Sequence, residues 1–568
     1  MDYKKCFADL ILEQLGSDFN FQEIYDLIEI PPKIDLGNFS FPCFFLSKSL
    51  KKSPVVISNN LSENIFSYIF SFKSLNGYLN ATINSSILVK NVISEILNKK
   101  KDFGKSDFGK NKSFVIDTFQ PNPLKMLHIG HIRNGVVGES ICRLLKFTGF
   151  DPRPVSYMGD VGTHIAKWLW YYDNFLAENK KLIPEKDKSK WFGNIYILAG
   201  EKILENKDLY KAQVESYQIQ LIKNINLQNR LKLFIDSSFN GYMEVAKELD
   251  INLCFNFFES QSEKKFNEIK EGLFNKYNYI FKEDQGAIVA DLNDKHLGNF
   301  IIIKSNHALL YGAKDIGLIN LKKEKFKDCN NFLYIVASEQ EFYFEQLFKL
   351  FKIIYPNLDN KHISHGLVNT PEGKMKSRSG SLFLYEDFRD ALFEKVNFVL
   401  DQNGLDKDSQ VIKDISFGTI KFELLKNSIF KTIVFDINKS TDLNGDSSAY
   451  VQYSGVRAKS ILDKSNFNNF NTDFLFLKDD FEKEELLLIN KLNEFKEKVI
   501  YASKDFKPNI IANYVIELSH IFNKFYNSCH VLCNNKSIST NRLLFTKAFY
   551  IVLENALYLL GINIPSKM

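Results

Sequence analysis

Paired cysteines, long apolar runs and arginine are all scarce in this chain of 568 residues. Of its seven cysteines only Cys529 and Cys533 lie close together, so neither a disulfide framework nor a four-thiolate zinc site is indicated. No stretch of about 18 uncharged apolar residues occurs, which predicts no transmembrane helix. The first residues, MDYKKCFADLILEQLG, interrupt a short apolar run with charges and lead to no small-residue cleavage site. These absences favour a cytoplasmic protein with no membrane partner.

Arginine makes up only eight of the 73 basic residues. Lysine, asparagine and phenylalanine, which all have A/T-rich codons, are abundant, so codon usage accounts for this bias. The formal net charge of +5 allows a polyanionic partner but does not require one. A hydrophobic fraction of 45% and a charged fraction of 25% are typical of globular proteins, and the length predicts about three or four domains.

The chain divides into three predicted regions. Residues 1–110 look like a separate module that ends in a polar, glycine-bearing linker. Residues 111–410 open with strand, loop and helix, as in the first unit of a doubly wound α/β nucleotide-binding fold, and lysine-rich helical stretches at about 175–300 indicate an insertion. Residues 411–568 have helical spacing throughout, which predicts a helical bundle.

Individual elements of these regions can be predicted from composition and spacing. The strands expected in the nucleotide fold are 113–119, 153–157, 333–337 and 363–368. Helices are expected at 84–98 and 340–354. The strongest helix candidates are 484–503, 509–529 and 541–560, the last of them stopping at Gly561.

Two histidines, His128 and His131, flank an isoleucine and a glycine between a predicted strand and a predicted helix. Gly130 would let a ligand approach the backbone, and the N-terminus of a helix favours phosphate. Histidine donors can stabilise the charge that develops on the α-phosphate of ATP during attack by a carboxylate. We therefore expect His128, Ile129, Gly130 and His131 to bind ATP.

A second segment, GKMKSRSG at 373–380, follows a predicted strand and has glycine at both ends. Cations on such a loop can close over a triphosphate and neutralise the departing pyrophosphate. We expect ATP contacts from Lys374, Met375, Lys376 and Ser377.

Together these two segments resemble the HIGH and KMSKS signatures of class I aminoacyl-tRNA synthetases. The surrounding sequence narrows the resemblance to the arginyl-tRNA synthetase family, and it does so in the family's order over nearly the whole chain. The segments that carry it are DLGNF at 35–39, Gln120–Asn122 with Lys125, MGDVGTHIAK at 158–167, LYGAKDIG at 310–317, Glu339 and Gln340 with Phe344 and Gln346, AYVQYSGVR at 449–457 and LLGINIPSKM at 559–568.

The resemblance implies a Rossmann-type class I catalytic domain with an insertion. It also implies an N-terminal α+β module that touches tRNA and a C-terminal α-helical bundle that binds the anticodon. For the tRNA contacts it points to Tyr450, Gln452, Tyr453 and Arg457. Because Arg133, Arg378 and Arg457 lie inside the matching motifs, we expect them to contact phosphate or tRNA.

Four positions depart from the family pattern. Gln120 replaces a serine, Lys376 and Ser377 stand where the loop has serine and its second lysine, and Tyr343 stands where histidine is common. The family often lacks the second loop lysine and then carries a lysine three residues before HIGH, which is Lys125 here. We therefore expect Lys125 and Lys374 to share the phosphate contacts with the HIGH residues.

Transferred position by position, the resemblance also implies an arginine site. Its members would be Gln120, Pro121, Asn122, His131, Tyr311, Asp315 and Gln340. A guanidinium presents five donors in a fixed fork, so a carboxylate such as that of Asp315 is its natural partner. A site built on such hydrogen bonds rejects amino acids that leave its polar groups unpaired.

The implied activity is ligation of L-arginine to tRNA(Arg) through arginyl-adenylate, by a monomer that uses ATP with Mg²⁺ and has no metal site of its own. The family further implies that tRNA must bind before arginine is activated. Two alternatives stay open: another class I synthetase and a non-catalytic tRNA-binding paralogue. A cysteine-specific enzyme would need zinc-ligand cysteines, whose spacing is wrong here, whereas the altered loop leaves the paralogue possible.

Overall fold

The chain forms two compact units, each built from separate stretches of sequence. One comprises Met1–Phe103, Ala458–Glu494 and His520–Val552, and the other Gly104–Arg457, Phe495–Ser519 and Leu553–Met568. The boundaries predicted at 110 and 410 stay predictions, because the C-terminal helices contribute to both units. The computed structural model describes residues 2–31, 36–176, 182–294, 296–370, 373–374, 384–405, 408–442, 445–465 and 481–568, with only the backbone at 222, 370, 373 and 374.

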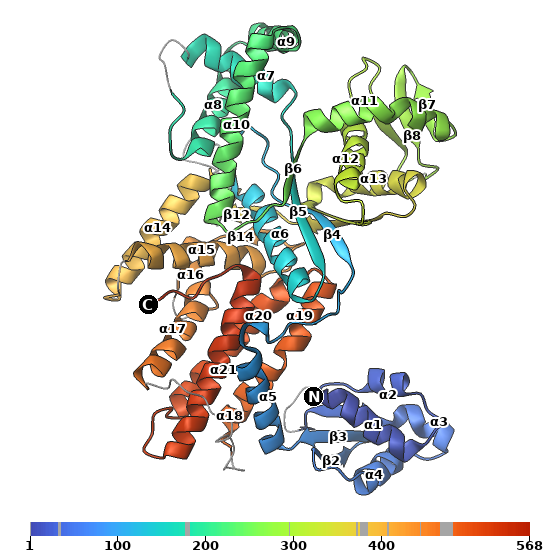
Figure 1. The fold of residues 1–568 in the computed structure, drawn as a ribbon, viewed down its shortest axis with the longest axis vertical. Coiled ribbons are helices and arrows are strands. Elements are labelled where there is room, and N and C mark those ends of the chain that lie inside the picture. The colour runs from blue at the N-terminus through green and yellow to red at the C-terminus, as the bar shows by residue number, and fades with distance from the viewer. Residues whose placement is uncertain are drawn as a thin grey trace. The chain divides into compact units, whose positions relative to one another are not determined.

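The N-terminal stretch of the first unit combines helices with a small antiparallel sheet of order β1-β3-β2 (Figure 1). The core contains Phe7 and Ile11 of its first helix. The helix predicted at 84–98 is present as α5. The elements are α1 (Tyr3–Leu15), α2 (Phe21–Leu27), β1 (Phe39–Pro42), η2 (Cys43–Leu46), α3 (Ser47–Leu50), α4 (Pro54–Asn64), β2 (Phe70–Leu75), β3 (Tyr78–Ile83), α5 (Ser85–Lys99) and η3 (Lys100–Asp102).

A five-stranded parallel sheet of order β11-β10-β4-β5-β6 forms the centre of the second unit. Its strands are β4 (Ser113–Asp117), β5 (Asp151–Met158), β6 (Phe255–Phe258), β10 (Asn331–Ala337) and β11 (Asp359–His365). The helices that connect them are α6 (Ile129–Phe147), α11 (Glu259–Lys276), α12 (Tyr311–Lys325) and α13 (Glu341–Ile354). The strand order reverses between β4 and β10, where doubly wound folds bind their ligands. The predicted nucleotide fold is confirmed.

Two insertions interrupt this fold instead of the single one predicted at 175–300. A helical insertion follows β5, and a three-stranded antiparallel sheet follows α11. The prediction was wrong because β6 and α11 lie inside that range and belong to the central fold: β6 has only four residues, and α11 is as lysine-rich as the inserted helices. The inserted elements are α7 (Thr163–Tyr171), η4 (Tyr172–Leu176), α8 (Lys188–Glu205), α9 (Lys207–Lys223), α10 (Ile225–Glu248), β7 (Phe281–Asp284), β8 (Ala287–Asp291) and β9 (Asn299–Ile303).

The rest of the chain is a small sheet of order β13-β12-β14 and a series of helices. The predicted helix 484–503 is two helices separated at Glu494. Helix α21 ends at Leu560, directly before Gly561 (φ 69°), so the predicted stop is confirmed. By length and composition α21 could cross a membrane, but 78% of its most apolar window is buried inside the protein, as in a core helix. The elements are η6 (Ser338–Gln340), β12 (Val368–Thr370), β13 (Gly373–Lys374), α14 (Tyr385–Gln402), α15 (Ser409–Leu425), β14 (Ile433–Val434), α16 (Ile437–Ser440), α17 (Ser448–Lys464), α18 (Lys483–Asn493), α19 (Phe495–Lys504), α20 (Asn509–Ser528) and α21 (Lys536–Leu560).

Candidate active site

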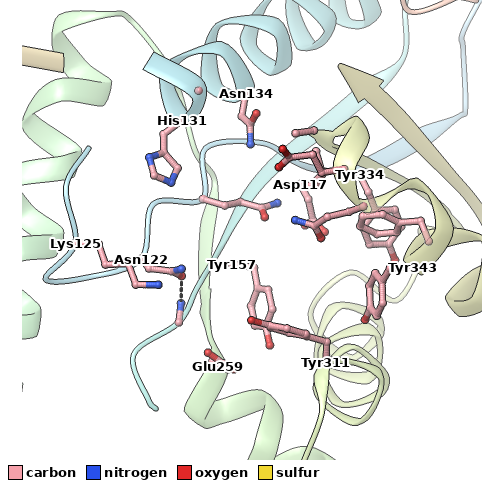
Figure 2. A pocket seen from close by; sticks show the side chains of 18 of the residues that line it. Asp117, Asn122, Lys125, His131, Asn134, Tyr157, Glu259, Tyr311, Tyr334 and Tyr343 are labelled. Atoms are coloured by element: carbon pink, nitrogen blue, oxygen red, sulfur yellow. Dashed lines mark hydrogen bonds between the residues drawn. The ribbon is translucent and has the colours of Figure 1, made fainter. Parts of the chain in front are cut away.

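A cavity of about 1070 Å³ lies where β4 and β10 end and the strand order reverses (Figure 2). Its walls come from the segment between β4 and α6, the start of α12 and the turn η6, with β5 and β11 adding residues at their ends. The fold thus brings distant predicted residues to one place. The predicted residues that line the cavity are Gln120, Asn122, Lys125, His128, Ile129, Gly130, His131, Tyr311, Asp315 and Gln340.

The two histidines cap helix α6 and stack on each other, with ring centroids 3.8 Å apart. The Nδ1 atom of His128 accepts the backbone N–H of Gly130 at 3.1 Å, and the Nδ1 atom of His131 accepts that of His128 at 3.4 Å. Burial lowers the pKa of His128 to about 4 and that of His131 well below its usual value. Both rings are therefore neutral and carry their proton on Nε2, which makes each a hydrogen-bond donor.

Gly130 leaves room for this stacked pair, because a Cβ atom there would lie 3.0 Å from the His128 ring and would push against it. Ile129 also lines the cavity, although only 5% of its surface is exposed.

A tight turn from Asn122 to Lys125 precedes the histidines. The N–H of Lys125 donates to the carbonyl of Asn122 at 3.3 Å, Pro123 occupies the second position, and Leu124 has a φ of 61°. These are the features of a type II turn. The Oδ1 atom of Asn122 accepts the N–H of Gly159 at 2.9 Å, which fixes this side chain against the end of β5 (Figure 2).

Lys125 is half-buried in the wall of the cavity. Burial lowers its pKa, and the carboxylate of Glu259 partly opposes this shift. Lys167 also lies nearby, where burial and the charge of Lys125 lower its pKa to about 8. Cationic side chains thus gather near the start of α6, where the helix N-terminus already favours anions.

The opposite part of the cavity is acidic and aromatic. Burial raises the pKa of Asp315 to about 6, and a hydrogen bond donated by the Tyr343 hydroxyl opposes that rise. Tyr311 is 70% exposed, and its ring contacts the Tyr343 ring edge-on, with the ring centroids 6.3 Å apart. Glu259 pairs with Lys314 beside them. This arrangement can bind a cation between a carboxylate and aromatic rings.

Sequence reasoning missed Asp117, which ends β4 at the floor of the cavity. Its Oδ2 atom pairs with the buried Lys322 at 2.5 Å, whereas its Oδ1 atom is buried without a hydrogen-bond partner in the described part of the chain. Burial raises its pKa, and Lys322 opposes that rise. A carboxylate at the C-terminal end of a predicted strand is the signal that would have identified it.

The remaining predicted residues either do not line the cavity or have side chains that lie outside the described part of the chain. Pro121 is buried and does not contribute to the lining as far as the chain is described. Lys374 is described only as backbone, in β13 opposite Asn369 of β12. The predictions for Met375, Lys376, Ser377 and Arg378 fall outside the described residues.

The prediction that Arg133 contacts phosphate or tRNA is wrong. Its side chain is fully buried, and its guanidinium donates to backbone carbonyls beyond β11 and before β14, so it stabilises the fold. The four acceptors are the carbonyl oxygens of Gly366, Leu367, Ile429 and Lys431, at 2.5 to 3.1 Å.

The residues predicted to bind tRNA lie on α17. Gln452 is fully buried, and its amide donates to the carbonyls of Asp414 at 3.0 Å and Asn563 at 2.8 Å. Its side chain therefore joins α17 to α15 and to the segment after α21, and is unsuited to contact RNA. Tyr450 and Tyr453 are partly exposed. The Arg457 guanidinium lies 4.8 Å from the centre of the Tyr453 ring.

Comparisons with known families agree with this geometry. The model described as "tRNA synthetases class I (R), catalytic domain" matches residues 92–437. "Arginyl tRNA synthetase N terminal domain" matches residues 2–83, and "DALR anticodon binding domain" matches residues 451–568. Within the described residues no cluster of histidine, cysteine or acidic side chains could hold a metal ion.

Similar proteins and structures extend over the full length. The arginine–tRNA ligases of Clostridium perfringens and Halothermothrix orenii are 31% and 30% identical to this chain, with all of each chain covered. The fold resembles that of Thermus thermophilus arginyl-tRNA synthetase, with a TM-score of 0.80 at 20% identity over the whole of both chains. It also resembles that of Plasmodium falciparum arginyl-tRNA synthetase, with a TM-score of 0.77 at 20% identity over 100% and 99% of the two chains. The histidine-capped helix, the matching domain models and these full-length relatives agree, and the chain belongs to the arginyl-tRNA synthetase family.

Proposed function

We propose that the cavity between β4 and β10 is the site at which this arginine–tRNA ligase activates L-arginine with ATP and transfers it to tRNA(Arg). A carboxylate oxygen of arginine attacks the α-phosphorus of ATP and pyrophosphate leaves. The terminal ribose hydroxyl of tRNA then attacks the carbonyl carbon of the adenylate and AMP leaves. No bond to the enzyme forms in either step, so positioning and electrostatics carry the catalysis.

On the phosphate side, His128 and His131 would donate from Nε2 to the α-phosphate. Their neutral state leaves an N–H donor on each ring, whose hydrogen bond strengthens as further negative charge develops on the phosphate oxygens. Lys125 would neutralise the phosphates from the cavity wall, together with Lys374. Gly130 keeps the entry to α6 free of side-chain atoms.

On the amino-acid side, arginine carries two cations and the cavity offers carboxylates at two places. Asp315 would bind the guanidinium, with Tyr311 and Gln340 completing the hydrogen bonds. Asp117 would make a second contact, to the α-ammonium group, because it lines the cavity and ends the strand that leads to the histidines. Asn122 and the backbone of Gln120 would orient the reacting carboxylate.

The neutral, Nε2-protonated histidine pair facing a carboxylate pocket is the observation that carries this proposal. We further propose that Mg²⁺ enters with ATP and that the enzyme is a cytoplasmic monomer. For tRNA, Tyr450, Tyr453 and Arg457 on α17 would contact the RNA by stacking and by charge.

Pyrophosphate exchange measured with each amino acid, in the presence and absence of tRNA(Arg), tests the activity. We expect exchange with arginine and with no other amino acid, and we expect it only when tRNA is present. Exchange with a different amino acid would identify another class I specificity, and no exchange at all would favour a non-catalytic tRNA-binding protein.

The division of phosphate contacts has its own test. Lys125→Ala should slow arginine-dependent exchange by about 100-fold, the usual effect of removing one transition-state donor. Lys374→Ala should act similarly. Lys349→Ala, which changes a partly exposed lysine on α13, is the control and should have no effect. Unchanged exchange in Lys125→Ala would remove Lys125 from the mechanism.

A further inference from the structure

The turn that carries Lys125 has a leucine where its backbone favours glycine or asparagine. Leu124 occupies the third position of the turn with a φ of 61°, a value that L residues with side chains seldom adopt. Such a conformation persists only when the surroundings enforce it. The groups that enforce it here belong to the helical insertion.

The side chain of Leu124 is completely buried in the hydrophobic core of that insertion. It packs in one cluster with residues of α7, α8 and α10, including Trp168, Phe192 and Phe234. Its backbone N–H donates to the hydroxyl of Ser238 on α10 at 3.0 Å, and Ser238 is itself fully buried. The Asn122–Lys125 turn is therefore held against the insertion by both the side chain and the main chain of Leu124.

Tyr242 lies four residues after Ser238 on α10 and contacts both ends of the Asn122–Lys125 turn. Its hydroxyl contacts the carbonyl oxygen of Lys125 at 2.7 Å and that of Asn122 at 2.9 Å. The side chain is fully buried, and burial raises its pKa, so it stays protonated and acts as the donor. The buried hydroxyl of Tyr242 is thus the shared hydrogen-bond donor for the carbonyls at both ends of the turn.

Helix α8 supports the next residue. A Cβ atom on Gly193 would lie 2.7 Å from the Cα atom of Met126, so α8 packs directly on the backbone that follows Lys125. A Cβ atom on Gly241 would lie 2.8 Å from the Cβ atom of Lys188, so α10 and α8 are also in close contact with each other. These two helices lie side by side in Figure 1.

We propose that the helical insertion positions the phosphate-binding lysine, with Tyr242 and Ser238 of α10 as positioning residues that hold the Asn122–Lys125 turn. A lysine side chain is long and flexible, so the placement of its backbone decides whether its ammonium reaches the phosphates. This inference rests on the proposed role of Lys125. It gives the insertion a part in activation in addition to any contact it makes with RNA.

Tyr242→Phe tests the inference, because it removes only the hydroxyl. Tyr217→Phe is the matched control: Tyr217 donates to Asp173 inside the same insertion and lies outside the cavity lining in the described chain. In pyrophosphate exchange with saturating tRNA(Arg), Tyr242→Phe should lower kcat by about tenfold or more, as expected for a misplaced catalytic group. The KM for arginine should change less than kcat, because Tyr311, Asp315 and Gln340 come from other elements and the Asn122 side chain keeps its own contact with the N–H of Gly159.

Combination with Lys125→Ala shows whether Tyr242 acts through Lys125. The double variant should be no slower than Lys125→Ala, because the group that Tyr242 positions is already gone. The inference would be overturned if the decrease in kcat of the double variant equalled the product of the two single decreases. Equal kcat values for Tyr242→Phe and Tyr217→Phe would overturn it as well.

Ser238→Ala provides a second variant on the same turn, with the same expected fall in kcat and the same lack of effect in the Lys125→Ala background. If Tyr242→Phe does not fold, Ser238→Ala decides the question. If Lys125→Ala lowers kcat but Ser238→Ala and Tyr242→Phe have normal kcat values, the positioning role is rejected and the phosphate role of Lys125 stands. A normal Lys125→Ala instead rejects the phosphate role of Lys125, and the positioning role with it.

Discussion

Lys322 pairs with one oxygen of Asp117, a residue of the cavity lining, and leaves the other oxygen of that carboxylate buried without a partner among the described residues. Both side chains are almost completely buried, at 1% and 3% exposure. The Lys322 ammonium also lies 4.7 Å from the centre of the Tyr334 ring. The cavity proposed to bind arginine therefore has a buried cation in its wall, whose charge favours the ionised form of the nearby carboxylates.

Lys322→Met should raise the KM for arginine by about tenfold or more, because an unpaired buried Asp117 takes up a proton and loses its charge. Lys322→Arg keeps the charge and should recover most of the affinity. Lys265→Met is the control, since Lys265 on α11 pairs with Glu324 away from the cavity. Steady-state kinetics in arginine and thermal melting of all three variants check this. A Lys322→Met enzyme with a lower Tm and a normal KM would reduce the pair to a structural role.

Arginine binding should weaken as the pH falls through about 6, the pKa to which burial raises Asp315. The guanidinium stays charged, so only the ionised carboxylate binds it well, and affinity is present above the pKa and lost below it. For a single group this amounts to about a tenfold rise in the dissociation constant between pH 7 and pH 5. Calorimetric titration with arginine over this range measures it. A flat profile would exclude Asp315 as the guanidinium partner.

Tyr343→Phe should move that transition to higher pH. The Tyr343 hydroxyl donates to Asp315 and holds the pKa of the carboxyl lower than burial alone would set it, so its removal raises the pKa. Arginine affinity at pH 7 should fall in the variant and recover at higher pH. The same titrations, extended to pH 8, check the shift. A transition at lower pH would contradict this account.

Local patterns were enough to predict much of the nucleotide fold and of the cavity. The strand before HIGH, the helix it caps and the segment LYGAKDIG all carry local signals, and the residues predicted there line one cavity. The Asn76-Gly77 dipeptide between β2 and β3 is also a hairpin signal, although the expected elements of the N-terminal module did not include these strands.

The residues that sequence reasoning missed depend on contacts between distant segments. Tyr242 is 117 positions from the carbonyl it holds, and Lys322 is 205 positions from Asp117. Each has an ordinary local context, and Lys322 is one of many lysines on amphipathic helices. Arg133 shows the reverse error: its place in a motif suggested a ligand contact, but burial and its carbonyl acceptors give it a structural role.

Arg133→Met should destabilise the catalytic unit by about 3 kcal/mol or more, because it leaves several buried carbonyls without a donor. Urea unfolding of the variant against wild type measures the change. Arg230→Met is the matched control, since Arg230 is half-exposed and pairs with Asp173, and its replacement should cost at most about 1 kcal/mol. An Arg133→Met protein as stable as wild type, but with weakened tRNA binding, would restore the phosphate interpretation.

Arg457→Ala should weaken tRNA binding without unfolding the protein, whereas Gln452→Leu should do the opposite. Arg457 lies over the Tyr453 ring on α17, where a phosphate contact would be sensitive to salt, and Gln452 is buried between backbone carbonyls. If Arg457 contacts one phosphate, the slope of the logarithm of the binding constant against that of salt concentration should fall by about one in the variant. Filter binding of tRNA(Arg) at several salt concentrations, with melting curves of both variants, separates the two roles. An unchanged slope for Arg457→Ala would show that this arginine makes no phosphate contact.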